Sequence, residues 1–349
     1  MTKILVVRYR FIGDTILTIP FLRNLRKAYP DAQIDLMVGP VSGELLENCP
    51  YIDNLIYFDT TKKHRYENTG EKKKSFWDYV FMLKNQNYDK AYVLKRSFSS
   101  ALLVFLAGIK HRIGFNTENR GFLLTKTIPY DKNKHEIECF LDVLKADNVP
   151  VVDDYLENWI DAKDTVKIND IFNTNHIDNR PKVLIHATSG NINKQWPVKY
   201  FAKIIEYLAN QKNAQIFYTG TKADKAVYEE IHGHIKEPFS VKPLNLCGEL
   251  NLKESAALTK RMDLMIGCDS GNLHIAASLN IPVIGIYGPM NYKKWYAWGK
   301  DHSILVDNIP CIPCELKKKC KNDRACLLNI TPAQVIAEID KKFEKRHCE

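Results

Sequence analysis

The sequence predicts an α/β protein made of two Rossmann-like domains with parallel, doubly wound sheets. Its 349 residues exceed what one hydrophobic core usually supports, which favours two domains. Short apolar runs alternate with segments of helical periodicity, as in βαβ units. The alternation stops in an Asp- and Asn-rich stretch and restarts after Pro181, so the same architecture is expected twice.

The first domain is assigned to residues 1–165. Residues 3–9 predict a buried strand, Gly13 a tight turn, residues 14–28 a helix, and residues 33–38 a second strand parallel to the first. The same alternation then predicts strands at 55–58 and 90–94 and helices at 76–87 and 99–107. The basic segment between them, residues 60–75, is expected to form a surface loop.

The second domain is assigned to residues 180–330. Its pattern predicts strands at 182–186, 215–218, 264–267 and 283–287, with helices at 198–210, 223–232, 253–261 and 271–279. Residues 331–349 are expected to form a last helix, with Pro332 in its first turn, that could pack back across both domains.

Charge and hydropathy limit the classes of partner. The longest apolar run near the middle, residues 101–107, is far shorter than the ~20 residues of a membrane-spanning helix, so a cytoplasmic protein is expected. A net charge of +9 indicates an anionic partner: nucleic acid, a membrane surface or a phosphorylated substrate. The basic loop lacks interleaved aromatic residues, which argues against nucleic acid.

Asp14 is the first candidate catalytic residue. It follows Gly13 at the carboxyl end of the first strand, where ligands bind in open α/β sheets. It is either a helix-capping or first-turn acid or a general base. The three-glycine dinucleotide fingerprint is absent there, which counts against an NAD enzyme.

Two further motifs follow strands of the second domain and suit phosphate. Thr188 and Ser189 offer hydroxyl and N–H groups, and Lys194 offers a positive charge, although Lys194 could equally be a solvated lysine. Ser270 and Gly271 begin a helix whose free N–H groups form an anion site. His274 inside that helix is either a core histidine or a catalytic one.

Four cysteines lie close together late in the chain. Cys311 and Cys314 form a CxxC pair, and Cys320 and Cys326 follow at intervals that no common zinc finger uses. A structural zinc or iron–sulfur site, disulfides and free thiols all remain open.

Taken together, these motifs resemble the ADP-heptose:lipopolysaccharide heptosyltransferases, family 9 of the glycosyltransferases. The resemblance spans nearly the whole chain. It rests on residues 12–20 (IGDTILTIP), on 186–189 (HATS) with 194–197 (KQWP), and on 269–274 (DSGNLH) followed by 285–289 (GIYGP).

This resemblance implies a GT-B fold, with two facing Rossmann-like domains and a cleft between them. It implies inverting transfer of heptose from ADP-heptose to a lipopolysaccharide inner-core acceptor, Kdo-lipid A or heptosyl-Kdo-lipid A, without a required cofactor. Asp14 would be the base and Lys194 would neutralise the leaving diphosphate. The nucleotide sugar would be bound by Thr188, Ser189, Lys194, Asp224, Leu250, Asp269, Ser270, Gly271 and His274.

An anionic glycolipid acceptor would call for cationic contacts in the first domain. The candidates for acceptor binding are Gly13 and the cationic residues Lys62, Lys63, Arg65, Lys72, Lys73, Lys74, Arg96 and Arg120. Peripheral contact with the inner leaflet of the inner membrane would follow, and nucleic acid is not expected as a partner. The alternatives are a related glycosyltransferase with another nucleotide sugar and a different surface glycan, and a non-catalytic nucleotide-binding protein.

Overall fold

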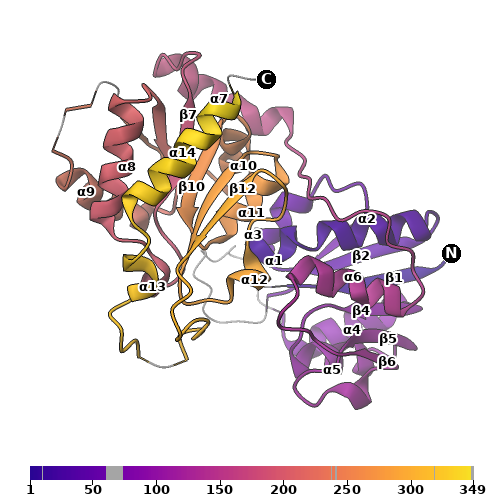
Figure 1. The fold of residues 1–349 in the computed structure, drawn as a ribbon. Helices are drawn as coiled ribbons and strands as arrows, with labels where there is room; N and C mark the ends of the chain where they lie inside the picture. The colour runs from indigo at the N-terminus through magenta and orange to yellow at the C-terminus, as the bar shows by residue number, and fades with distance from the viewer. Residues whose placement is uncertain (10, 60–73, 237, 240–241, 318, 347–349) are drawn as a thin grey trace. The chain divides into compact units, whose positions relative to one another are not determined.

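The computed structural model describes residues 1–349 except 10, 60–73, 237, 240–241, 318 and 347–349. The described chain divides into two compact units, Met1–Tyr155 and Leu156–Glu349. Each unit contains one parallel six-stranded sheet with helices packed on it (Figure 1). In the described residues, no helix is long and apolar enough to cross a membrane.

The sheet of the first unit has the strand order β3-β2-β1-β4-β5-β6. Its strands are β1 (Lys3–Val7), β2 (Gln33–Val38), β3 (Asn54–Tyr57), β4 (Lys90–Val93), β5 (His111–Phe115) and β6 (Lys126–Ile128). Its helices are α1 (Ile12–Ile16), α2 (Ile19–Ala28), α3 (Pro40–Gly43), α4 (Phe76–Gln86), α5 (Phe98–Leu106) and α6 (Glu136–Ala146), with 3-10 turns η1 (Glu44–Leu46) and η2 (Gly121–Leu123).

The sheet of the second unit has the order β12-β11-β10-β7-β8-β9. Its strands are β7 (Lys182–His186), β8 (Gln215–Tyr218), β9 (Leu244–Asn245), β10 (Leu264–Cys268), β11 (Val283–Tyr287) and β12 (His302–Val306). Its helices are α7 (Ala162–Thr174), α8 (Val198–Asn210), α9 (Lys225–Gly233), α10 (Leu252–Lys260), α11 (Gly271–Ser278), α12 (Tyr292–Trp295), α13 (Ala325–Leu328) and α14 (Pro332–Arg346), with η3 (Ile192–Lys194) and η4 (Lys222–Asp224).

Both strand orders are that of a doubly wound nucleotide-binding sheet. In each unit the first strand lies in the middle, next to the strand that reverses the direction of winding: β1 beside β4, and β7 beside β10. Ligands of such sheets bind at this switch point, beyond the carboxyl ends of the strands. The loops after β1, β4, β7 and β10 are therefore the expected ligand-binding loops.

Several elements differ from the sequence expectation. The single helix predicted over residues 14–28 is two helices, because the chain breaks at Leu17 and Thr18 and restarts with Pro20 in the first turn of α2. The Asp- and Asn-rich stretch contains α7, whose only buried apolar residues are Ile168 and Phe172. Strands β5, β6, β9 and β12 and helix α6 were not anticipated.

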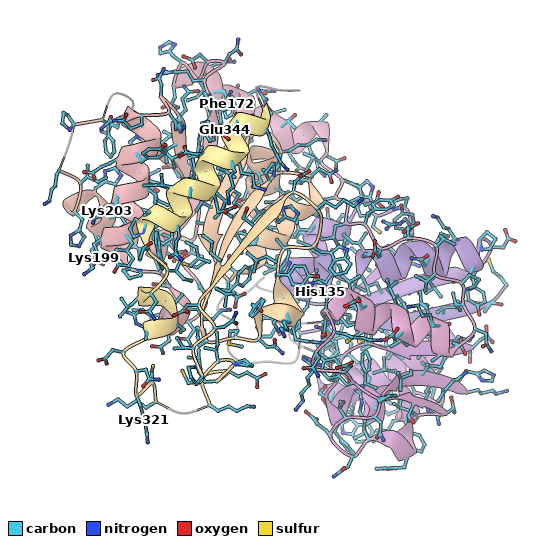
Figure 2. All side chains as sticks on the ribbon, viewed as in Figure 1. His135, Phe172, Lys199, Lys203, Lys321 and Glu344 are labelled. Atoms are coloured by element: carbon cyan, nitrogen blue, oxygen red, sulfur yellow. The ribbon has the colours of Figure 1, made fainter. Side chains whose placement is uncertain are left out.

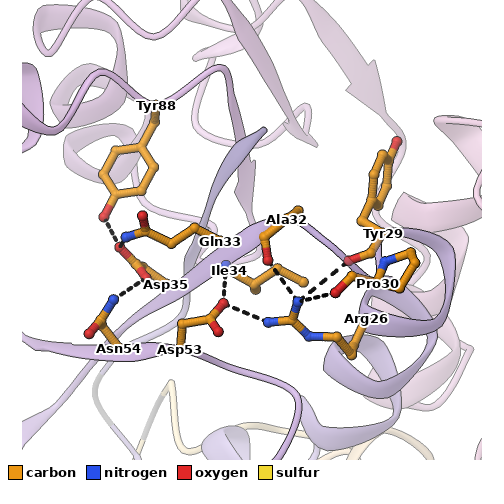
Figure 3. Close-up of polar contacts among 10 residues, drawn as sticks. All are labelled: Arg26, Tyr29, Pro30, Ala32, Gln33, Ile34, Asp35, Asp53, Asn54 and Tyr88. Atoms are coloured by element: carbon orange, nitrogen blue, oxygen red, sulfur yellow. Dashed lines mark hydrogen bonds and ion pairs between the residues drawn. The ribbon is translucent and has the colours of Figure 1, made fainter. Parts of the chain in front are cut away.

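The opposite, amino-terminal edge of the first sheet is closed by a polar network (Figure 3). Arg26 donates to the carbonyls of Pro30 and Ala32 and to the carboxylate of Asp53. Asp35 accepts hydrogen bonds from Tyr88 at 2.5 Å and from Asn54 at 2.9 Å. Arg26 is paired with Asp53, and Asp35 accepts from neutral donors, so these residues have a structural role at this edge.

Candidate active site

Asp14 lies at the switch point of the first sheet, in the first turn of α1. Phe11 is the N-cap residue of that helix, so the Asp14 carboxylate does not cap it. Instead Asp14 Oδ2 lies 2.7 Å from Nη2 of Arg8, the residue that follows β1. Both side chains are almost fully buried. The arrangement holds a carboxylate in place beside a fixed positive charge.

A second carboxylate shares this cation. Glu136, at the start of α6, is fully buried and has Oε1 3.7 Å from Arg8 Nη2. Tyr130 donates a hydrogen bond of 2.5 Å to Glu136 Oε2, and the guanidinium of Arg96 lies over the Tyr130 ring, 4.1 Å from its centroid. Arg8, Glu136 and Tyr130 were not singled out from the sequence. Only the fold brings α6 against the loop after β1.

The electrostatic surroundings raise the pKa of Asp14 above the ordinary value for a carboxyl group. Burial is the largest cause, because it disfavours the charged form, and Glu136 adds to it. Arg8 acts in the opposite direction, followed by Lys95 and Arg96 from the loop after β4. A carboxylate with a raised pKa is a better proton acceptor, as a general base requires.

Lys194 and Asp269 meet at the switch point of the second sheet. Lys194, in η3 after β7, has Nζ 2.8 Å from Oδ2 of Asp269, which follows β10. The hydroxyl of Ser189 donates to the carbonyl oxygen of Asp269 at 3.0 Å. Thr188, the residue before Ser189, is also buried. The structure therefore brings together Ser189, Lys194 and Asp269, which the sequence analysis assigned to one binding site.

Helix α11 begins at the same place and points its amino end to this edge. Ser270 is its N-cap residue, yet its side chain does not cap the helix. In the described part of the chain, Ser270 Oγ and the buried His274 Nδ1 have no hydrogen-bond partner. Burial lowers the pKa of His274 to about 4, so it is neutral at pH 7. Unsatisfied donors at a helix amino terminus suit an anionic group.

Asp224 and Leu250 lie on two adjoining loops after β8 and β9. Gly248 N–H donates to the carbonyl of Gly220 at 2.9 Å, which ties these loops together. A side chain at Gly248 would collide with Lys222, and its φ of +75° also favours glycine. Asp224 Oδ2 accepts from the N–H and hydroxyl of Thr221, so one carboxylate oxygen holds its own loop.

The comparisons with known proteins identify the family. The model of glycosyltransferase family 9 (heptosyltransferase) matches residues 79–325. The chain belongs to this family. The family 9 chain is 27% identical to lipooligosaccharide heptosyltransferase 2 of Haemophilus ducreyi, over 97% of this chain and 99% of that protein. It is 28% identical to lipopolysaccharide heptosyltransferase 2 of Escherichia coli, over 97% of each chain.

Solved structures agree on the fold of this glycosyltransferase. The structure of E. coli ADP-heptose lps heptosyltransferase II aligns with a TM-score of 0.77 at 23% identity, covering 99% of this chain and all of that one. A family 9 glycosyl transferase from Veillonella parvula aligns with a TM-score of 0.83 at 21% identity, covering 99% and 97%. The prediction of a GT-B glycosyltransferase with two doubly wound sheets is confirmed.

The cationic residues predicted to bind the acceptor have different surroundings in this family 9 enzyme. Lys74 is exposed and Arg96 is half-buried over Tyr130. Arg120 is fully buried, and its guanidinium donates to the carbonyls of Phe115, Lys95 and Ser97. Arg120 thus fixes the loop after β4. The predicted contacts at Lys62, Lys63, Arg65, Lys72 and Lys73 lie outside the described residues.

The late cysteines carry free thiols. Cys311 and Cys320 are exposed, Cys314 is half-buried and Cys326 is buried. Burial raises the pKa of Cys326 to about 11, and the other three cysteines add to this effect. Among the described residues, no group of three or more His, Cys, Asp or Glu side chains is arranged to hold a metal ion.

Proposed function

We propose that this family 9 glycosyltransferase transfers heptose from ADP-heptose to an inner-core acceptor of lipopolysaccharide, Kdo-lipid A or heptosyl-Kdo-lipid A. The observation that carries the proposal is the pair of switch points. One holds a buried carboxylate, Asp14, and the other holds a cation and a helix amino terminus, Lys194 and α11. Inverting transfer needs a base for the acceptor and an anion site for the leaving group.

Asp14 is the general base in this proposal. Its carboxylate takes the proton of an acceptor hydroxyl, whose oxygen then attacks the anomeric carbon of the donor. The bond from that carbon to the diphosphate breaks on the opposite face, and its electrons leave with ADP. Because Arg8 fixes the carboxylate at 2.7 Å, the base is positioned before the acceptor arrives.

The leaving diphosphate is bound at the second switch point. Lys194 supplies the positive charge, while Thr188, Ser189, Ser270 and the N–H groups at Gly271 supply hydrogen-bond donors. Their fixed positions require little reorganisation as negative charge develops. His274 is neutral at pH 7 and acts as a hydrogen-bonding group in this site.

The remaining donor contacts lie in the second unit, and the remaining acceptor contacts lie in the first. Asp224 binds the ribose hydroxyls and the backbone near Leu250 reads adenine, because their loops adjoin at Gly220 and Gly248. Asp269 orients Lys194 or contacts the sugar. Gly13, Lys74 and Arg96 contribute to acceptor binding, together with the basic segment. The enzyme acts in the cytoplasm, at the inner leaflet where its lipid-linked acceptor is found.

The decisive experiment is transfer by purified protein with ADP-heptose and a panel of Kdo-lipid A and heptosylated acceptors. ADP release and product mass identify the donor and the step. Asp14→Asn should bind ADP-heptose with unchanged affinity in calorimetry and lose at least about a hundredfold in turnover. The exposed Asp31→Asn is the matched control and should keep full activity.

Two results would contradict the proposal. Full turnover by Asp14→Asn would remove Asp14 as the base. An absence of ADP release with every acceptor, together with release of another nucleotide from a different nucleotide sugar, would instead assign the enzyme to another surface glycan.

A further inference from the structure

Helix α5 exposes an apolar outer face. Its inner side packs on the first sheet through Ala101, Leu103 and Val104, which are fully buried. On the outer side, Phe98 and Phe105 lie two turns apart and are 38% and 44% exposed. A helix on the surface of a globular domain usually presents polar residues outward, so this face is unusual.

A third aromatic side chain extends this face. Phe122, in η2, is 74% exposed, and its ring centroid lies 6.2 Å from that of Phe98. We call Phe98, Phe105 and Phe122 the aromatic surface. Helix α4 lies beside α5 (Figure 1). It carries Trp77 and Phe81, one turn apart, which are 56% and 61% exposed. Large apolar side chains thus gather on two neighbouring helices.

Cations accompany the aromatic surface. The guanidinium of Arg112 lies over the Phe105 ring, 5.2 Å from its centroid, and donates to the carbonyl of Leu123, next to Phe122. Lys110 and Lys126 are also exposed: Lys110 lies immediately before β5, and Lys126 is the first residue of β6. The combination of exposed aromatic rings and flanking Lys and Arg is typical of a surface that enters the headgroup layer.

Two acidic residues of these segments accept hydrogen bonds from backbone N–H groups. Glu118 accepts the backbone N–H of Phe98 at 2.7 Å, at the amino end of α5. Asp78 accepts the backbone N–H of Ser75 at the amino end of α4. Both carboxylates face helix amino termini, where the helix dipole favours a negative charge, so their positions have a structural cause.

We propose that the aromatic surface of the first unit docks on a bilayer of anionic phospholipid. The aromatic rings enter the interface and the flanking cations contact lipid phosphates. Phe98 lies at the amino end of α5, which follows β4, whereas Arg112 and Lys126 lie where β5 and β6 begin, so the aromatic surface runs along the outer side of the sheet. The inference rests on the proposed lipid-linked acceptor, but vesicle binding tests it without turnover.

The test compares the full-length protein with a Phe105→Ser/Phe122→Ser double variant in sedimentation with vesicles. Vesicles of phosphatidylcholine with phosphatidylglycerol should bind the unchanged protein, whereas pure phosphatidylcholine should bind it at least tenfold more weakly. Because two large apolar rings would no longer enter the interface, the double variant should lose at least about tenfold in affinity for anionic vesicles. Val166→Ser, at an exposed position of α7, is the matched control.

Activity separates this inference from the proposed function. With detergent-dispersed acceptor, the double variant should match the unchanged protein, and it should fall behind only with acceptor in vesicles. Equal vesicle binding by the double variant would overturn the inference. A second result would also overturn it. If light scattering showed that the unchanged protein is a dimer and the double variant a monomer that still binds vesicles, the aromatic surface would join two copies of the chain instead.

Discussion

Arg8 lies 2.7 Å from the carboxylate of Asp14 and 3.7 Å from that of Glu136, so one buried cation is shared by two buried carboxylates. Each of these three residues is at most 9% exposed. In so little solvent, a change of one charge alters the proton affinity of its neighbours strongly. The acidity of the proposed base is therefore set by residues that need not touch substrate.

Arg8→Gln should raise the pKa of Asp14 further, because it removes the main opposing charge. The acid limb of the pH profile of kcat/KM should move to higher pH, and activity at pH 7 should fall by about tenfold or more. Arg8→Lys keeps the charge and should stay closer to the unchanged enzyme. An equal loss at every pH, without a shifted limb, would indicate a purely structural role.

Glu136→Gln should shift the same limb in the opposite direction. The substitution keeps the shape of the side chain but removes a negative charge that raises the pKa of Asp14. Asp14 then loses its proton at lower pH. The neighbouring Glu138 is exposed and accepts the backbone N–H of His135, so Glu138→Gln is a matched control that should leave the profile in place. Identical profiles for both variants would contradict the coupling.

Lys194→Ala should weaken donor binding by about tenfold or more, the usual effect of losing a charge-assisted contact. Calorimetry with ADP measures the effect directly. Lys199, on α8 and labelled in Figure 2, is exposed, and Lys199→Ala should not change the affinity. Unchanged ADP affinity in Lys194→Ala would mean that Lys194 serves only to neutralise Asp269.

The second unit should lose stability in mild acid. Burial lowers the pKa values of His274 and His302 to about 4, below the usual value near 6.5 for an exposed histidine. The unfolded chain takes up protons as the pH falls through about 6.5, and the folded chain does not, so stability decreases towards pH 4. His274→Gln should reduce the drop in urea midpoint between pH 7 and pH 5. An undiminished drop would exclude His274 as a contributor.

Arg120→Ala should destabilise the first unit by about 3 kcal/mol, because buried carbonyls lose a charged donor. The affected carbonyls belong to Phe115 and to the loop of Lys95 and Ser97. Thermal unfolding measures the loss. Arg180→Ala, at a solvent-exposed pair with Asp178, should change stability by less than about 1 kcal/mol. Equal effects of the two variants would contradict the structural role of Arg120.

Most central strands and helices could be predicted from the sequence, because buried strands and amphipathic helices leave clear periodicities. The elements that were missed carry weak local signals. Helix α7 is rich in Asp, Asn and Lys, and its only buried apolar residues are Ile168 and Phe172. Strand β6 has three residues, of which Ile128 alone is buried. Tertiary packing, rather than the local pattern, stabilises such elements.

The candidate site could be predicted where its residues follow one another in sequence. Asp14, Lys194 and Asp269 stand in short motifs after strands, and the fold places each at a switch point. The partnership of Arg8 with Glu136 could not be predicted, since 128 positions separate them and only the packing of α6 joins them. Likewise, no periodicity shows the outer face of α5, because that helix is apolar on both sides.

The loop that carries Lys194 is held by residues much later in the chain. Trp196 donates its indole N–H to the carbonyl of Ile330 at 2.8 Å, and Arg324 donates to the carbonyls of Ile192 and Gln195. During synthesis on the ribosome, this loop emerges more than a hundred residues before its supports. The Lys194 loop therefore cannot reach this packing until the chain has been synthesised beyond Ile330, and a product truncated before Arg324 should bind the proposed donor poorly.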